Sequence, residues 1–152
     1  MFKEEKRNGQ GSAMPAKNIY HDVVLHALLA DGWTITHDPL TISYGGRDLF
    51  VDLGAERPVV AAEKGERKIA VEIQSFLNPS PVRDLEEAVG QFEIYRTVLA
   101  EAEPERSLYL AVPNRVYETF LVERFGQLII DRLRLRILVF DNRQERLLQW
   151  IN

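Results

Sequence analysis

The sequence contains no cysteine, and this absence excludes disulfide bonds and thiolate metal sites. It also contains no apolar run of about 18 residues, the length that a transmembrane helix requires. The first residues, MFKEEKRNGQGSAMP, are charged and lack the apolar segment of a secretory signal. We therefore expect a cytoplasmic protein with no transmembrane helix that folds without covalent cross-links.

An excess of positive charge is absent as well. The chain has 23 acidic and 19 basic residues, which gives a formal net charge of −4. A protein that binds nucleic acid non-specifically is usually basic, because neutralising phosphates supplies its affinity. The charge balance therefore argues against strong DNA binding by the isolated chain, while leaving room for a local basic face.

The chain has 152 residues, which fits a single domain with its own hydrophobic core. Residues 1–13 are polar and contain Gly9, Gly11 and Ser12. We expect them to form a flexible N-terminal extension, or to be a segment left by cloning or by an early start codon, with Met14 as the usual start. Residues 14–152 are expected to form the domain.

Two segments show apolar residues at helical spacing, Ile19–Leu29 and Val82–Ala102, and each predicts an amphipathic helix. The break Asn78-Pro79-Ser80-Pro81 precedes the second helix. A further helix is predicted over Val116–Phe125, and Gly126–Ile130 is left open. The β-rich runs are Trp33–Tyr44 with a turn at Pro39, Pro58–Glu63, Lys68–Phe76, Ser107–Val112, Leu133–Asp141 and Leu147–Ile151. This order of elements is typical of an α/β fold with a mixed sheet flanked by helices.

The runs 58–63 and 68–76 are separated by Lys-Gly-Glu-Arg, which predicts a hairpin. If the hairpin turns at Gly65-Glu66, Val59 lies opposite Glu72. In the strand Leu133–Asp141 the neighbouring basic residues would project to one face and meet phosphate, an acidic partner or solvent. These residues are Arg132, Arg134 and Arg136.

The stretch Lys68–Phe76 holds the most informative pattern. In a strand, Glu72 and Gln74 point to the same face, about 7 Å apart. Burying a carboxylate is costly unless it is compensated, and a divalent metal would compensate it. Mg²⁺ usually takes one or two carboxylates together with water and phosphate oxygens. The pattern therefore suggests a metal site that acts on a phosphodiester.

Two short patterns resemble a known nuclease fold. Glu72-Ile73-Gln74 stands where the PD-(D/E)XK fold, that of restriction endonucleases, carries Glu-x-Lys. Gln91-Phe-Glu-Ile-Tyr95 looks like the Gln-x-x-x-Tyr element of RecB-type nucleases in the same superfamily. This resemblance implies a restriction-endonuclease-like mixed central sheet flanked by helices.

Longer runs are similar to the XisH family, cyanobacterial proteins described as controlling excision of the fdxN element. The resemblance covers residues 14–152, and it implies a role in DNA rearrangement beside a site-specific recombinase and a XisI-like partner. DNA and a second copy of the chain are further possible partners. The runs are 14–22 (MPAKNIYHD), 32–40 (GWTITHDPL), 44–49 (YGGRDL), 52–56 (DLGAE) and 61–64 (AAEK) through Ser75-Phe76.

The resemblance also implies a site. Asp52 and Glu72 would bind Mg²⁺ or Mn²⁺, with Asp48 and Glu56 as alternatives to Asp52. Gln74 would take the place of the catalytic lysine, and it is neutral, so it cannot supply the lysine's charge. Supporting roles would fall to Gln91 and Tyr95. Two hypotheses follow: a catalytically impaired scaffold that works with a XisI-like protein, and an active metal-dependent endonuclease.

The remaining polar candidates carry weaker signals. His21 and Asp22 lie on the first predicted helix, within reach of a site, although surface or capping roles are commoner for such residues. His26 and His37 show no spacing typical of metal ligands.

Overall fold

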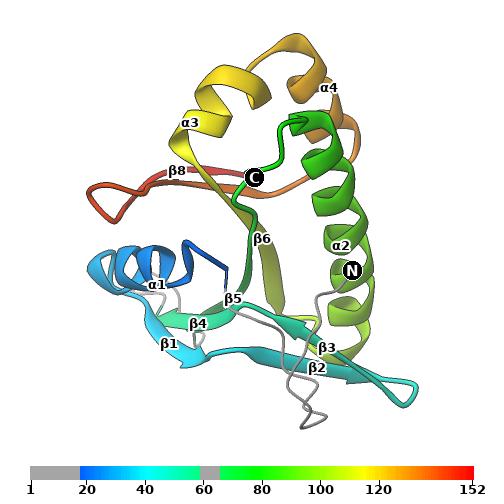
Figure 1. The fold of residues 1–152 in the computed structure, drawn as a ribbon. Coiled ribbons are helices and arrows are strands. Elements are labelled where there is room, and N and C mark those ends of the chain that lie inside the picture. The colour runs from blue at the N-terminus through cyan, green and yellow to red at the C-terminus, as the bar shows by residue number, and fades with distance from the viewer. Residues whose placement is uncertain (1–17, 59–65) are drawn as a thin grey trace, which may run out of the picture.

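The computed structural model describes residues 18–58 and 66–152, so the predicted extension over residues 1–13 lies outside them. A six-stranded sheet has the order β1-β4-β5-β6-β7-β8, and a separate ribbon consists of β2 and β3 (Figure 1). The elements are α1 (His21–Ala30), β1 (Thr34–His37), β2 (Leu40–Tyr44), β3 (Arg47–Val51), β4 (Leu53–Pro58), β5 (Glu66–Ile73), α2 (Pro81–Ala102), β6 (Arg106–Pro113), α3 (Asn114–Val116), η1 (Tyr117–Leu121), α4 (Arg124–Arg132), β7 (Ile137–Asp141) and β8 (Arg146–Ile151). The predicted α/β class is confirmed, with a mixed sheet flanked by helices.

The centre of the sheet is built around β5. It pairs antiparallel with β4 and parallel with β6, and α2 makes the crossover between the two parallel strands. β7 continues the parallel part, and β8 returns antiparallel at the edge. The sequence signal was strongest here: α2 was predicted to within one residue, because its apolar stripe is long and Ser80 and Pro81 mark its start.

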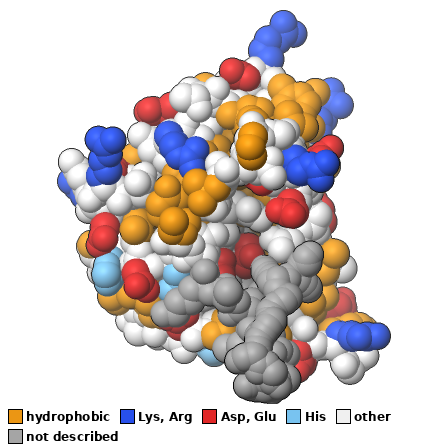
Figure 2. All heavy atoms as spheres, in the orientation of Figure 1, with side chains coloured by type: hydrophobic (Ala, Val, Ile, Leu, Met, Phe, Trp, Pro, Cys, Tyr) orange, Lys and Arg blue, Asp and Glu red, His pale blue; other side chains and the backbone are white. Residues whose placement is uncertain are grey.

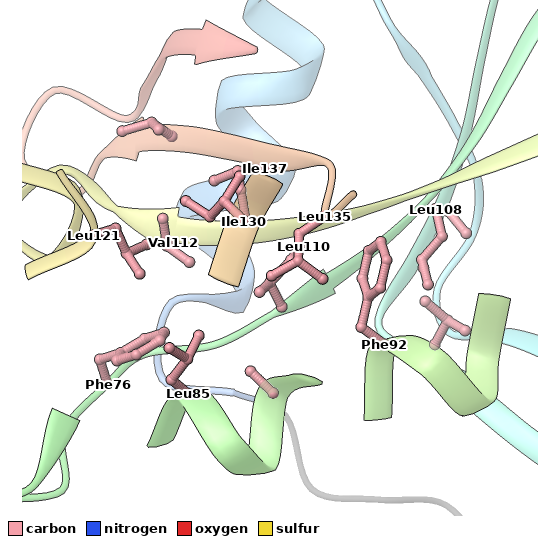
Figure 3. Close-up of a cluster of buried hydrophobic side chains, with 14 of the residues drawn as sticks. Phe76, Leu85, Phe92, Leu108, Leu110, Val112, Leu121, Ile130, Leu135 and Ile137 are labelled. Carbon is pink, nitrogen blue, oxygen red and sulfur yellow. The ribbon is translucent and has the colours of Figure 1, made fainter. Parts of the chain in front are cut away.

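Residues of the central strands alternate between two hydrophobic clusters. On the face covered by α2, Ala70 of β5 and Leu110 of β6 pack with Phe92 of the helix, as Figure 3 shows for the labelled Leu110 and Phe92. On the other face, Val71 packs with Val24 of α1. Period-two alternation across a sheet covered on both sides explains why these strands are nearly all apolar. Glu72 lies two residues beyond Ala70 and is therefore directed to the α2 face.

The predicted register of the central hairpin is wrong. Leu53 pairs with Val71, so Val59 does not lie opposite Glu72, and residues 59–63 of the predicted strand lie outside the described residues. The observed register buries Leu53 and Ala55 completely. A slip of one residue would turn both to the other face, so burial fixes the pairing.

The segment after β6 also differs from the prediction. In place of one helix over Val116–Phe125, a short α3 continues into the π-helical η1, and α4 starts at Arg124. A side chain at Gly126 would come within 2.5 Å of the Leu121 carbonyl oxygen. The glycine thus allows α4 to pack closely on the preceding turn, and this close contact involves a residue that the sequence left open.

The prediction of a basic strand face is wrong as well. Arg132 is the last residue of α4, and Arg134 adopts a φ of 52° in the turn that follows. Arg136 is exposed and precedes β7, which begins at Ile137. The three arginines therefore do not share a strand. None of the helices over residues 18–58 and 66–152 combines the length and hydropathy of a membrane-spanning helix.

Candidate carboxylate site

Asp52 and Glu72 are brought together at the start of β4 and the end of β5. Leu53 pairs with Val71, so extending the register by one residue sets Asp52 opposite Glu72. The backbone N–H of Asp52 donates to Glu72 Oε1 at 3.2 Å, and the N–H of Ile73 donates to Asp52 Oδ2 at 2.8 Å. Each carboxylate thus binds the backbone of the other's strand, which fixes both side chains.

The two carboxylates differ in their exposure to solvent. Glu72 is only 8% exposed, whereas Asp52 is half-buried. Hydrogen bonds from backbone N–H groups offset part of the desolvation of a buried carboxylate. Two carboxylates held this close together are costly for stability alone, and such a pair is typical of a site that binds a cation.

Gln74 and Gln91 extend the polar cluster toward α2. The Gln74 backbone N–H donates to the Ala111 carbonyl at 2.9 Å, which holds the residue beside the end of β6. Its side-chain Nε2 donates to Gln91 Oε1 at 3.1 Å. The Gln74 side-chain amide therefore joins the end of β5 to α2.

Tyr95 lies one helical turn after Gln91 and completes the cluster. Burial raises the pKa of the Tyr95 phenol far above its ordinary value of 10.0, and the charges of Glu72 and Asp52 raise it further. Tyr95 therefore stays protonated and remains a hydrogen-bond donor close to both carboxylates.

This coupling makes a pH prediction. Glu72→Gln is expected to lower the pKa of Tyr95, because it removes one of the two charges and leaves burial as the main cause. Alkaline titration of the phenolate absorbance would measure it, with Tyr95→Phe identifying the signal of this tyrosine. Since the pKa is raised in the folded state, the unfolded state loses its proton first, and stability falls as the pH rises above 10.0. An unchanged Tyr95 titration in Glu72→Gln would contradict the coupling.

The two alternative acids lie elsewhere. Asp48 is exposed on the β2–β3 ribbon, where Ser43 donates to it at 2.6 Å. Glu56 lies farther along β4, with Oε2 3.5 Å from Arg106 Nη2. Of the three acids considered, only Asp52 meets Glu72.

Asn18, just before α1, contacts the end of β5 beside the two carboxylates, and the sequence did not predict this contact. Asn18 Nδ2 donates to the Ile73 carbonyl at 3.1 Å, and the two residues are 55 positions apart. His21 is buried, with Nε2 2.7 Å from Asp38 Oδ1, whereas Asp22 is exposed. No periodic signal links such distant positions, so only the folded chain reveals these neighbours.

The donor set fits one kind of metal site. No group of three or more histidine, aspartate and glutamate side chains suited to a metal occurs within residues 18–58 and 66–152. Among the residues that the structure describes, Asp52 and Glu72 are thus not joined by a third such ligand. They match the pattern of Mg²⁺, which is held by one or two carboxylates while water or phosphate fills the remaining positions.

The fold and the polar cluster define a mixed α/β protein with an acidic pair at the heart of its sheet. A family model described as "XisH protein" matches residues 14–148, and the chain belongs to the XisH family. The chain is similar to the crystal structure of a XisH family protein from Nostoc punctiforme, with 45% identity and a TM-score of 0.80 over 89% of this chain and 100% of that one.

A second solved structure gives the same result. It is described as a fdxN element excision controlling factor protein from Anabaena variabilis, with 47% identity and a TM-score of 0.79 over 88% of this chain and 98% of that one. Comparison with the curated proteins gave no match.

Proposed function

We propose that this XisH-family protein controls excision of a DNA element, the role named for its Anabaena variabilis relative. In this proposal the protein has an endonuclease-like fold of the PD-(D/E)XK type. The arrangement of the sheet supports this assignment, because an antiparallel hairpin carrying the acidic pair is followed by a crossover helix and a parallel strand.

The proposal rests on the two reciprocal hydrogen bonds that fix the Asp52 and Glu72 carboxylates side by side, with the Gln74 amide nearby. Asp52 and Glu72 would hold Mg²⁺ or Mn²⁺. When bound, such an ion acidifies a water molecule and stabilises the charge that develops on a phosphodiester. The chain's own contribution is to fix both carboxylates through backbone hydrogen bonds and to keep the Tyr95 hydroxyl protonated beside them.

The chemistry of the Gln74 side chain bears on whether the protein is a non-catalytic scaffold or an active nuclease. An amide can orient a water molecule, but it is neutral and cannot balance developing negative charge. Its hydrogen bond to Gln91 further directs it toward α2. We infer that the isolated chain cleaves DNA poorly and acts as a metal-binding scaffold together with a XisI-like protein.

Protein recognition also suits the overall charge better than non-specific DNA binding, because the chain carries a net charge of −4. The alternative is an active metal-dependent endonuclease. The intact acidic pair favours it, because those two side chains provide the metal ligands that the chemistry needs.

A cleavage and binding assay separates the two candidates. Wild type, Glu72→Gln and Gln74→Lys would be incubated with supercoiled plasmid and Mg²⁺ or Mn²⁺, and each would be tested for complex formation with a XisI-like protein. The scaffold role predicts a stable complex, no turnover by the wild type, and cleavage at most in Gln74→Lys. Metal-dependent cleavage by the wild type that Glu72→Gln abolishes would establish the endonuclease instead.

A further inference from the structure

The segment around α4 exposes apolar side chains that the carboxylate site does not use. Val122, Phe125 and Leu128 are 50%, 45% and 49% exposed. Phe125 and Leu128 lie three residues apart on α4, so they share its outer side, while Gly126 and Ile130 are buried on the inner side. Figure 2 shows hydrophobic side chains, with charged ones around them, over the end of the molecule where Figure 1 places α4.

This apolar surface is anchored in the core. The rings of Phe125 and Phe120 lie 6.2 Å apart between centroids, and those of Phe120 and Phe76 lie 6.4 Å apart. Phe76 is buried. The exposed Phe125 is therefore the outermost member of an aromatic row, and a partner docking on it would meet a rigid surface.

The charges at the two ends of α4 are ordered so that they complement each other when the helix is reversed. Glu123 and Arg124 stand at its start, and Asp131 and Arg132 stand at its end. All four side chains are exposed. None of them forms an ion pair with any other residue within 18–58 and 66–152. Read in the opposite direction, acid falls on base at every one of these positions.

We infer that α4 is the interface of a homodimer, in which it packs antiparallel against the α4 of a second copy. A two-fold axis between Gln127 and Leu128 sets Arg124 against the partner's Asp131, because these two residues are seven apart and share one side of α4. Phe125 and Leu128 then pack at the centre. Such a self-complementary patch is what a two-fold symmetric interface requires.

The alternation of signs favours a second copy over other occupants. A nucleic acid would be repelled by Glu123 and Asp131, since phosphate binding needs basic residues. A membrane surface would leave the same two carboxylates facing lipid headgroups and acyl chains. In the antiparallel dimer, Asp131 meets the partner's Arg124, so neither of these two charges faces a like charge.

Charge exchange tests the pairing. Sedimentation or light scattering over a concentration series should show a dimer for the full chain. Arg124→Glu and Asp131→Arg should each weaken dimerisation about tenfold or more, because each sets like charges against one another. The double variant Arg124→Glu/Asp131→Arg should recover the wild-type dissociation constant. A monomer at every concentration, or a double variant no tighter than the singles, overturns the inference.

A cross-link tests the geometry independently of affinity. Since the chain has no cysteine, Leu128→Cys introduces a single thiol close to the two-fold axis. Mild oxidation should convert this variant to a disulfide-linked dimer. Leu148→Cys, on β8 and 48% exposed, is the matched control and should stay largely monomeric. Equal cross-linking of the two variants would contradict an interface at α4.

Discussion

Replacing Arg106 with methionine is expected to lower the free energy of unfolding by about 3–5 kcal/mol. The Arg106 side chain is 2% exposed and joins three elements. Its Nη1 donates to the Ile69 carbonyl at 2.9 Å, its Nε donates to Glu103 at 2.8 Å, and its Nη2 lies 3.5 Å from Glu56. Methionine fills much of the space but removes every donor, so a buried carbonyl and two carboxylates lose a partner.

The matched control is Lys68→Met. Lys68 Nζ lies 3.9 Å from Glu105 Oε2, and the two side chains are 34% and 55% exposed. An exposed pair of this kind contributes about 1 kcal/mol or less, so the control should unfold near the wild-type urea midpoint. Urea unfolding followed by circular dichroism gives both values. Equal losses for Arg106→Met and Lys68→Met would show that burial does not set the importance of Arg106.

Truncating Phe92 to alanine is the second large change, with an expected cost of about 3–5 kcal/mol. Phe92 is fully buried on α2 and packs with Leu108 and Leu110 of β6, as Figure 3 shows. Its ring also lies under the Arg96 guanidinium, with the carbon 4.8 Å from the ring centre. Removing the ring loses apolar burial and leaves a cavity that the strands cannot close.

Ile94→Ala on the same helix is its control. Ile94 is 57% exposed, so its truncation removes little buried area and should change stability by about 0.5 kcal/mol or less. Thermal and urea unfolding of both variants would measure the difference. A Phe92→Ala protein as stable as Ile94→Ala would mean that α2 does not depend on this contact to hold the sheet.

The sequence predicted those parts of the fold that rest on local periodicity. α2 has a long apolar stripe and a serine-proline start, and β6 contains the apolar run Leu108–Val112, so the prediction of neither element depends on distant residues. The order of helices and strands then sufficed for the fold class. The residues that determine each of these elements are neighbours in the sequence.

Features that depend on contacts between distant residues could not be predicted from local sequence patterns. The register of β4 on β5 depends on which residues the sheet buries, and the predicted turn at Gly65-Glu66 shifted it. The helix break before α4 depends on the contact between Gly126 and Leu121. The predicted arginine face required all three arginines to lie in one strand. The observed strand β7 begins only at Ile137, after the last of them.

The candidate site combines residues that a local pattern singled out with residues that only distant contacts bring together. The family resemblance and the strand pattern singled out Glu72 and Gln74, whereas the choice among Asp48, Asp52 and Glu56 needed the true register. The link from Asn18 to Ile73 joins residues that no periodic pattern relates. Polar residues that share one face of a strand can be predicted from sequence, whereas contacts between residues far apart in the chain require the structure.

Calorimetric titration of Mn²⁺ into the wild type, Glu72→Gln and Glu87→Gln tests most directly whether Asp52 and Glu72 form one metal centre. Glu87 is an exposed carboxylate on α2, so its variant controls for loss of charge alone. The account predicts saturable binding by the wild type and Glu87→Gln that Glu72→Gln removes. Absence of binding in the wild type, or binding that survives Glu72→Gln, would contradict it.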